Sequence, residues 1–243
     1  VTVVAEAAGG IVPGSGLATG ATPGPGLGGS GGGLFGARGG RGTGLGLGHG
    51  TAQSETAVDR GLRWLAVHQD TAGAWRMEDF NPRKQLGTFD TGASALCLLA
   101  FLGAGHTDRE GDFRGPVSSA LRFLKSSQGR DGAFGPAFDG MMYNQALATL
   151  ALAEWATMTG DEGGLDAVQK GVDFLCRAQQ SGGGWDYGPS AATGRSDSSV
   201  TGWQVMALKS ALGAGARVPP ETLLRAMGHF LRQGRPQGDL NYA

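Results

Sequence analysis

The sequence predicts an all-α protein built from stacked helical hairpins. A stripe of apolar residues at helical spacing recurs along the chain, and between its copies lie stretches that are apolar on almost every side. No segment alternates apolar and polar residues for long enough to predict a strand. Because one hairpin cannot bury an apolar helix by itself, we expect several to stack, with amphipathic helices outside and apolar helices inside.

The amphipathic helices are predicted from apolar residues spaced i, i+4, i+7. The first has this stripe at Val58, Leu62 and Leu65, and Ser54 is its expected N-cap. The stripe then returns three times: at Val117, Leu121 and Leu124, at Val168, Val172 and Leu175, and in a weaker form at Leu224, Gly228 and Leu231. These copies predict three hairpins and part of a fourth.

The apolar helices are predicted over residues 91–105, 144–160 and 200–215. They are apolar nearly all round, which is typical of helices that are buried on most sides. The first and third end in the same tripeptide, GAG, and we expect Gly103 and Gly213 to be their C-caps.

Residues 1–50 differ in kind from the rest and hold 20 of the chain's 47 glycines. Glycine loses the most backbone freedom on folding and buries almost nothing in return. We therefore expect a disordered Gly/Pro-rich linker over residues 1–50 and a repeat domain over residues 51–243. A phosphate-binding glycine loop is excluded, because no strand precedes the glycines and no GK[ST] occurs. The sequence begins with Val, so we expect a fragment or a processed chain, which a segment upstream of the linker could anchor to a membrane.

The composition excludes several classes of partner and site. The net charge is −1 and the basic residues are scattered, which argues against a nucleic-acid surface. No apolar run in this sequence approaches the ~20 residues that a membrane span needs. Cys97 and Cys176 lie in apolar helical patterns without a second Cys or a His at ligand spacing. This predicts two buried thiols and leaves a disulfide between them open.

One pattern occurs twice, as RGLRWLAVHQDTAGAW at residues 60–75 and as KGVDFLCRAQQSGGGW at residues 170–185. A middle copy, SALRFLKSSQGRDGAF, spans residues 119–134. A Gln can bond backbone groups at a helix end, a Gly permits a turn with positive φ, and an aromatic ring can cover apolar surface. We expect the residues that recur in this order to hold each hairpin against the next: Gln69, Gly73 and Trp75; Gln128, Gly132 and Phe134; Gln179, Gly183 and Trp185.

The pattern resembles the QW motif of the prenyltransferase and squalene-cyclase repeat superfamily, over about residues 55–235. The fourth copy departs from the motif, with Arg235 and Asn241 at the Gln and Trp positions. The resemblance implies an α/α toroid, a ring of helical hairpins around an apolar lumen. This chain would form a part of such a ring.

The acid that the resemblance would imply is not matched. Class II terpene cyclases protonate an alkene with the central acid of a DxDDTA motif, and the segment at that place here is DSSVTG, residues 197–202. Asp197 matches the first Asp, but Ser199 replaces the acid, and a serine cannot supply such a proton. We therefore expect no catalytic residue in this chain.

The zinc set of the protein prenyltransferases is also unmatched. That set is an Asp, a Cys two residues later and a distant His, whereas Asp90 and Cys97 stand seven residues apart. Asp173 and Cys176 do not match either. We expect no metal and no cofactor.

Five residues near the starts of the apolar helices are candidates for a ligand site. If a ring closes, they would lie around one mouth of the lumen: Asp90, Tyr143, Asn144, Asp197 and Trp203. The simplest role of the two aspartates is to cap helices. The first functional hypothesis is a non-catalytic scaffold that offers an apolar concave surface to a lipid, an isoprenoid-like ligand or a protein partner. The alternative is a terpenoid-processing enzyme whose catalytic acid lies outside this chain. A carbohydrate-active enzyme would need a close carboxylate pair, which the sequence does not place.

Overall fold

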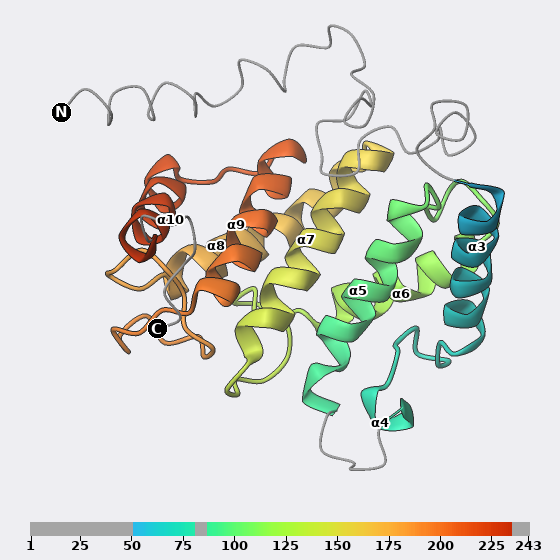
Figure 1. Ribbon diagram of the computed structural model, residues 1–243, viewed down its shortest axis with the longest axis horizontal. Coiled ribbons are helices and arrows are strands. Elements are labelled where there is room, and N and C mark those ends of the chain that lie inside the picture. Colours follow the sequence, from blue (N-terminus) through green and yellow to red (C-terminus); the bar gives the residue numbers. More distant parts are fainter. Residues whose placement is uncertain (1–50, 81–86, 235–243) are drawn as a thin grey trace, which may run out of the picture.

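The computed structural model describes residues 51–80 and 87–234. The predicted linker and the departures at Arg235 and Asn241 lie outside the described residues. Within those ranges the chain forms helices, and its β-type pairing is confined to isolated bridges (Figure 1). This confirms the predicted all-α fold. None of the helices in these ranges is long and apolar enough to cross a membrane.

The helices alternate between the two predicted kinds. The weaker fourth stripe is wrong in its residues, because Leu224 and Leu231 are 59% and 72% exposed and Thr222, Ala226 and His229 are buried instead. The amphipathic outer helices are α3 (Ala52–Val67), α6 (Arg114–Ser127), α8 (Leu165–Ala178) and α10 (Pro220–Gln233). The apolar inner helices are α5 (Asp90–Gly103), α7 (Met141–Thr159) and α9 (Ser198–Gly213). Short elements connect them: α4 (Met77–Phe80), η2 (Gly87–Phe89) and η3 (Glu162–Gly164).

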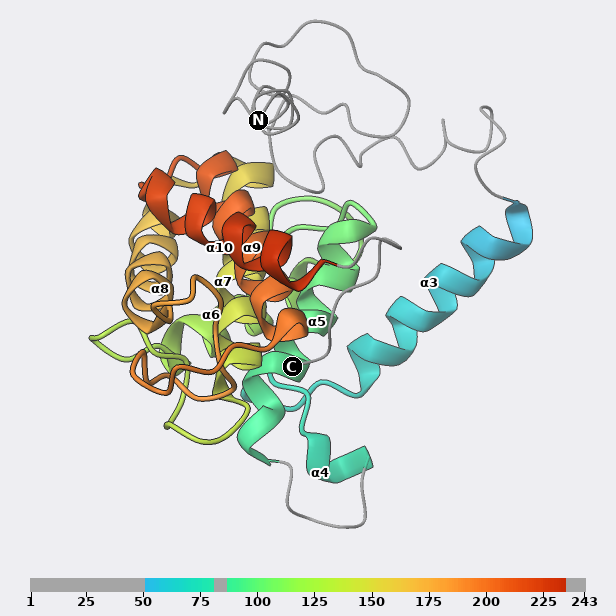
Figure 2. The ribbon, with the colours of Figure 1, turned by 60° about the vertical axis from the view of Figure 1, so that its left-hand side comes forward.

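The inner helices lie side by side in one row. Helix α7 is in the middle and packs against α5 and α9, while α8 packs against α7 from the outer layer. Figures 1 and 2 agree that α6 and α8 lie on one side of this row. The apolar surface of α7 is therefore covered from several directions, as its composition requires.

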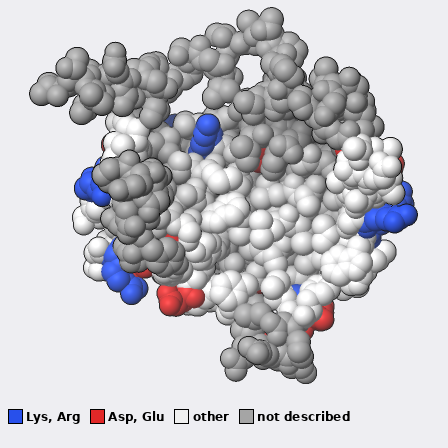
Figure 3. Space-filling model, in the orientation of Figure 1, with Lys and Arg blue, Asp and Glu red and all other residues white. Residues whose placement is uncertain are grey.

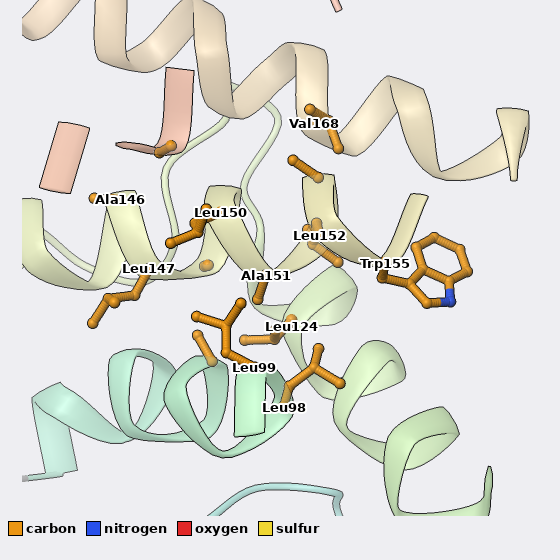
Figure 4. Packing of buried hydrophobic residues seen from close by; sticks show 14 of the residues in the cluster. Leu98, Leu99, Leu124, Ala146, Leu147, Leu150, Ala151, Leu152, Trp155 and Val168 are labelled. Carbon is orange, nitrogen blue, oxygen red and sulfur yellow. The ribbon is translucent and has the colours of Figure 1, made fainter. Parts of the chain in front are cut away.

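The core fills the space between the two layers. Leu98 and Leu99 of α5, Leu124 of α6 and Leu150 of α7 are buried in one cluster, and Figure 4 shows how they gather between the helices. Burying a side chain of this size contributes about 1.5 to 3 kcal/mol relative to exposing it. Because α5, α7 and α9 all contribute residues to this cluster, the core holds the inner helices against one another.

The first outer helix begins three residues earlier than expected. Thr51 is its N-cap: the Ser54 amide donates to Thr51 Oγ1 at 3.1 Å, and the Thr51 amide donates to Ser54 Oγ at 3.0 Å. This reciprocal pair is a capping box. The prediction of Ser54 as N-cap is therefore wrong, because Ser54 occupies the third helical position.

The predicted C-caps are also displaced. Gly103 and Gly213 are the last residues of α5 and α9, and Ala104 and Ala214 follow them as caps. The positive φ belongs to the second glycine of each GAG, with 87° at Gly105 and 91° at Gly215. The backbone N–H of the residue after each of these glycines donates to a carbonyl in the last turn of the helix. This hydrogen bond requires a residue in the left-handed conformation beyond the cap.

Each Gln of the recurring pattern joins two successive outer helices. Its Nε2 donates both to the carbonyl of the Gly in its own turn and to a carbonyl in the first turn of the next outer helix. The carbonyls on the next helix lie at 3.0, 2.9 and 2.8 Å from Gln69, Gln128 and Gln179, and belong to Pro116, Ala167 and Thr222 respectively. We call each of these contacts between outer helices a junction.

The glycines of the three turns allow the backbones to meet at each junction. Their φ angles are 91°, 89° and 89°, and an added Cβ would lie 2.1–2.2 Å from a carbonyl oxygen of the next outer helix. The pairs are Gly73 with Ser119, Gly132 with Lys170, and Gly183 with Arg225. Any side chain at these glycines would therefore separate the helices.

The aromatic residues of the turns are buried. Trp75 is 2% exposed, and Phe134 and Trp185 are 0% exposed. Each indole N–H donates at 2.8 Å to a carbonyl of the outer helix before its turn, Leu65 for Trp75 and Leu175 for Trp185. The rings thus close the outer helix against its own turn.

Candidate functional site at the start of the inner helices

The starts of α5 and α7 are joined through Asn144. Its Oδ1 accepts from the Gly92 amide at 3.2 Å, and its Nδ2 donates to the Thr88 carbonyl at 2.6 Å. Asn144 is 1% exposed, and a Cβ at position 92 would lie 2.5 Å from its Oδ1. Asn144 is therefore held by the protein on both of its polar atoms and has a clear structural role.

The starts of α7 and α9 are joined by a chain of hydroxyl groups. Ser199 Oγ donates to Asp197 Oδ1 at 2.6 Å, and Tyr143 Oη lies 2.8 Å from Ser199 Oγ. Because the Ser199 proton is directed to the carboxylate, Tyr143 is the donor in its contact with Ser199. Tyr187, from the loop before α9, donates to Asp197 Oδ2 at 3.0 Å. The four residues form one hydrogen-bonded group.

Asp197 is the N-cap of α9, which confirms that prediction. Its Oδ1 accepts from the amides of Ser199 and Val200 at 2.8 and 2.9 Å. Burial of this carboxyl opposes ionisation, but the hydrogen bonds from Ser199, Val200 and Tyr187 outweigh it and lower the pKa of Asp197. Asp197 is therefore an anion at neutral pH and a poor proton donor.

Asp90 does not cap α5, so that prediction is wrong. Phe89 is the N-cap and makes no side-chain capping bond. The Asp90 carboxylate instead accepts from the Met77 amide at 2.8 Å and pairs with Arg76 at 3.0 Å. Arg76 also pairs with Asp70 at 2.7 Å. Asp90 thus fastens the start of α5 to the end of the first turn.

Of the five candidates, Tyr143 and Asp197 are brought together through Ser199, and Asn144 lies beside them on α7. Trp203 is half-buried on α9 and packs against the apolar core. Tyr187 and Ser199 complete the group but were not predicted as site residues. Tyr187 lies in an irregular loop without a periodic signal, and Ser199 stood out only as the replacement of an acid.

The side of the inner row away from α6 and α8 is mostly uncharged. Figure 3 shows the centre of this face without charged side chains, which gather toward its rim. Leu96 on α5 and Met206 on α9 are 48% and 38% exposed although they stand on apolar inner helices. We call this surface the inner face. The only charged residue of α7, Glu154, is buried and lies 2.5 Å from the Ser210 hydroxyl.

A pocket of about 390 Å³ lies between α10 and the loop before α9, and its lining includes Tyr187 and Asp197 of the hydrogen-bonded group. Asp186, which is 3% exposed, pairs there with Arg195 at 3.0 Å. Burial opposes ionisation of Asp186, but the hydrogen bonds from Tyr187, Thr193 and Arg195 prevail and lower its pKa. The carboxylate is therefore already satisfied by the protein.

The two thiols are free and half-buried. Burial raises the pKa of Cys97 to about 12 and also raises that of Cys176, so neither is a thiolate at neutral pH. In residues 51–80 and 87–234, no three His, Cys, Asp or Glu side chains stand close enough to hold a metal ion.

Comparison with known proteins adds to this geometry. No protein-family profile matches the chain. Over 150 residues, 58% of this chain, the sequence is 31% identical to a protein of Sinorhizobium fredii (strain NBRC 101917 / NGR234) described as "Probable squalene–hopene cyclase". The chain is similar to a squalene–hopene cyclase. The aligned part is 22% of that protein, so the chain spans about a fifth of the relative's length. The similarity and the all-α fold together support a cyclase-like chain.

Proposed function

We propose that this cyclase-like chain is a non-catalytic repeat domain that binds a hydrophobic, isoprenoid-like ligand on its inner face. The observation that carries the proposal is the exposure of Leu96 and Met206 on the mostly apolar inner helices α5 and α9. Exposed apolar surface on an uncharged face is typical of a lipid or protein contact site. Tyr143 would add a polar contact at one end of the surface, whereas Asn144 is buried and both of its polar atoms are held by the protein.

The chemistry of the site supports a non-catalytic role. The position of the protonating acid is Ser199, whose proton is directed to Asp197. Asp197 itself has a lowered pKa, so it holds no proton to give at neutral pH. We also propose that the three turns are QW motifs and that the repeat domain begins at residue 51. The three equivalent junctions support this.

The experiment is a binding titration with a fluorescent anilinonaphthalene sulfonate, displaced by squalene. We expect Leu96→Asp and Met206→Asp each to raise the Kd for squalene by about tenfold, because a desolvated charge costs more than 1.4 kcal/mol. Leu231→Asp, at a 72% exposed site on α10, is the matched control and should leave the Kd unchanged. Equal binding by all variants would contradict the proposal.

The second candidate is a terpenoid-processing enzyme whose acid lies outside this chain, and the similarity to a cyclase favours it. Purified protein would be incubated with squalene and with a prenyl diphosphate, and the extracts analysed by gas chromatography and mass spectrometry. Product formed only when a polypeptide that carries the catalytic acid is added to this chain would support the second candidate. Product formed by this chain alone would overturn the non-catalytic proposal.

A further inference from the structure

Helix α3 differs from the other outer helices in what lies against it. Helices α6, α8 and α10 each pack on the inner helix that precedes them in the sequence, which is α5, α7 or α9. The described residues contain no inner helix before α3, and its main packing partner is α5, which follows it. One side of α3 therefore lacks the neighbour that its counterparts have.

The aligned positions of the repeats show which side this is. Gly61 of α3 corresponds to Ala120 of α6 and Gly171 of α8 in the recurring pattern. Ala120 is 0% exposed, and a Cβ at Gly171 would lie 2.5 Å from Thr149 Oγ1 of α7. Gly61 is exposed, and a Cβ there would meet nothing within 4 Å.

The neighbouring apolar position is open in the same way. Val58 is 43% exposed, whereas its counterparts Val117 and Val168 are each 0% exposed. Leu62, one position after Gly61, is 3% exposed because it faces the rest of the molecule. Val58 and Gly61 are thus both exposed on the side where a preceding inner helix would lie.

On α3, the two backbone carbonyls that would accept a Gln–Gly turn have no such turn against them in the described residues. On α6, α8 and α10, the incoming Gln and Gly meet two carbonyls three residues apart. The same register places Ala57 and Arg60 at these positions on α3. A hollow of about 330 Å³ lies at this place, and its lining includes both residues. Ala57, Val58, Arg60 and Gly61 together are called the α3 edge.

We propose that the α3 edge docks a helical repeat of another polypeptide, one that carries a free Gln-x3-Gly turn followed by an apolar helix. The turn would reach the Ala57 and Arg60 carbonyls, and the helix would cover Val58 and Gly61. The internal junctions define this partner, because they show what covers the same positions on α6, α8 and α10. The three described turns of this chain are bound to their own next helices, so an intact second copy supplies none of them.

The experiment frees one turn of the chain itself. A protein truncated after Gly215 lacks α10, which releases the Gln179 turn and one side of α9. We expect it to associate head to tail through the α3 edge of the next molecule, so that its mass in sedimentation velocity rises with concentration. The full chain should show no such rise.

Variants test the contact within that assembly. Gln179→Ala and Val58→Glu in the truncated protein should each raise the Kd of association by about tenfold, the equivalent of one good hydrogen bond. Arg63→Glu is the control, because Arg63 and its counterparts Arg122 and Asp173 are exposed and their side-chain hydrogen bonds lie within their own helices. A truncated protein that keeps its helical circular dichroism and stays monomeric would overturn the proposal.

If truncation unfolds the protein, a helix exchange in the full chain tests whether α3 can accept the Gln179 turn. Residues 55–68 would replace residues 220–233 in the full chain, which puts Ala57 at the place of Thr222 and Arg60 at that of Arg225. If α3 is an acceptor of the same kind, the exchanged chain folds, and Gln179→Ala lowers its Tm as it does in the parent. An exchanged chain that is unfolded, or that is insensitive to Gln179→Ala, would overturn the proposal.

Discussion

At the scale of single residues, the hydrogen-bonded group around Asp197 is the best-defined feature of the candidate site. Asp197→Ala removes the N-cap of α9 and leaves the Ser199 and Tyr187 hydroxyls without their acceptor. We expect the free energy of unfolding to fall by about 2 kcal/mol, measured by urea denaturation. Asp197→Asn keeps an acceptor oxygen and is the control, with a smaller loss. Equal losses in the two variants would show that capping is not what stabilises this site.

His229 of α10 gives a pH-dependent prediction. It is 4% exposed, and burial together with the nearby Arg232 lowers its pKa, while Asp197 opposes the shift. Because the folded pKa lies below the value of about 6.5 for the unfolded chain, the unfolded state binds the proton first as the pH falls. Stability should therefore be complete above about pH 7 and decline below about pH 6.5.

The check is urea denaturation across this pH range. His229→Gln should flatten the decline, because the variant has no imidazole to protonate at that position. His68→Gln, at an exposed position of α3, is the control and should keep the slope of the parent. A slope that survives in His229→Gln would refute the assignment.

Single residues also show what the sequence could predict about the site. Asp197 as a cap was predictable, because its partners Ser199 and Val200 follow within three residues. The contacts of Asp90 were not predictable, because its partners Arg76 and Met77 come 13 or more residues earlier in the sequence. Local hydrogen bonds can be predicted from local sequence, whereas pairs brought together by the fold cannot.

At the scale of helices and turns, the junction glycines carry the sharpest prediction. Gly132 and Gly135 have nearly the same φ, 89° and 88°, but a Cβ at Gly132 would lie 2.1 Å from the Lys170 carbonyl, and one at Gly135 would meet nothing within 4 Å. Gly135→Ala should cost about 1 kcal/mol for backbone strain alone. Gly132→Ala should cost about 3 kcal/mol, because it must also move α8. Chemical denaturation measures both, and equal costs would refute close packing at this junction.

Helix existence was predictable from the sequence, and helix ends were less so. The long apolar stretches of α5, α7 and α9 allow few other structures, because only the core can cover them. The ends depend on single hydrogen bonds: Thr51 rather than Ser54 starts α3, and Gly105 rather than Gly103 takes the left-handed conformation. In the second case both glycines of the GAG fit the composition rule, and only the path of the next backbone N–H distinguishes them.

At the scale of the whole molecule, the order of the helices along the chain sets the order of packing, and the recurring pattern predicted it. The openness of the α3 edge could not be predicted in the same way. Val58 and Gly61 match the buried positions of the other repeats in residue type, and only the missing neighbour makes them exposed. Whether a residue is buried depends on the neighbouring helices, so the residue pattern within one helix cannot predict it.

The same asymmetry predicts a gradient of local stability across the molecule. Helix α7 is buried along most of its length between α5, α8 and α9, so its amides should exchange only through global unfolding. Among the residues of α3, only Leu62 is buried, and the helix can open while the rest stays folded. Hydrogen exchange with mass spectrometry should therefore find α3 the fastest of the long helices. Docking of a repeat at the α3 edge would slow α3 without changing α7. Equal protection of α3 and α7 in the isolated chain would show that α3 is held by contacts other than those described.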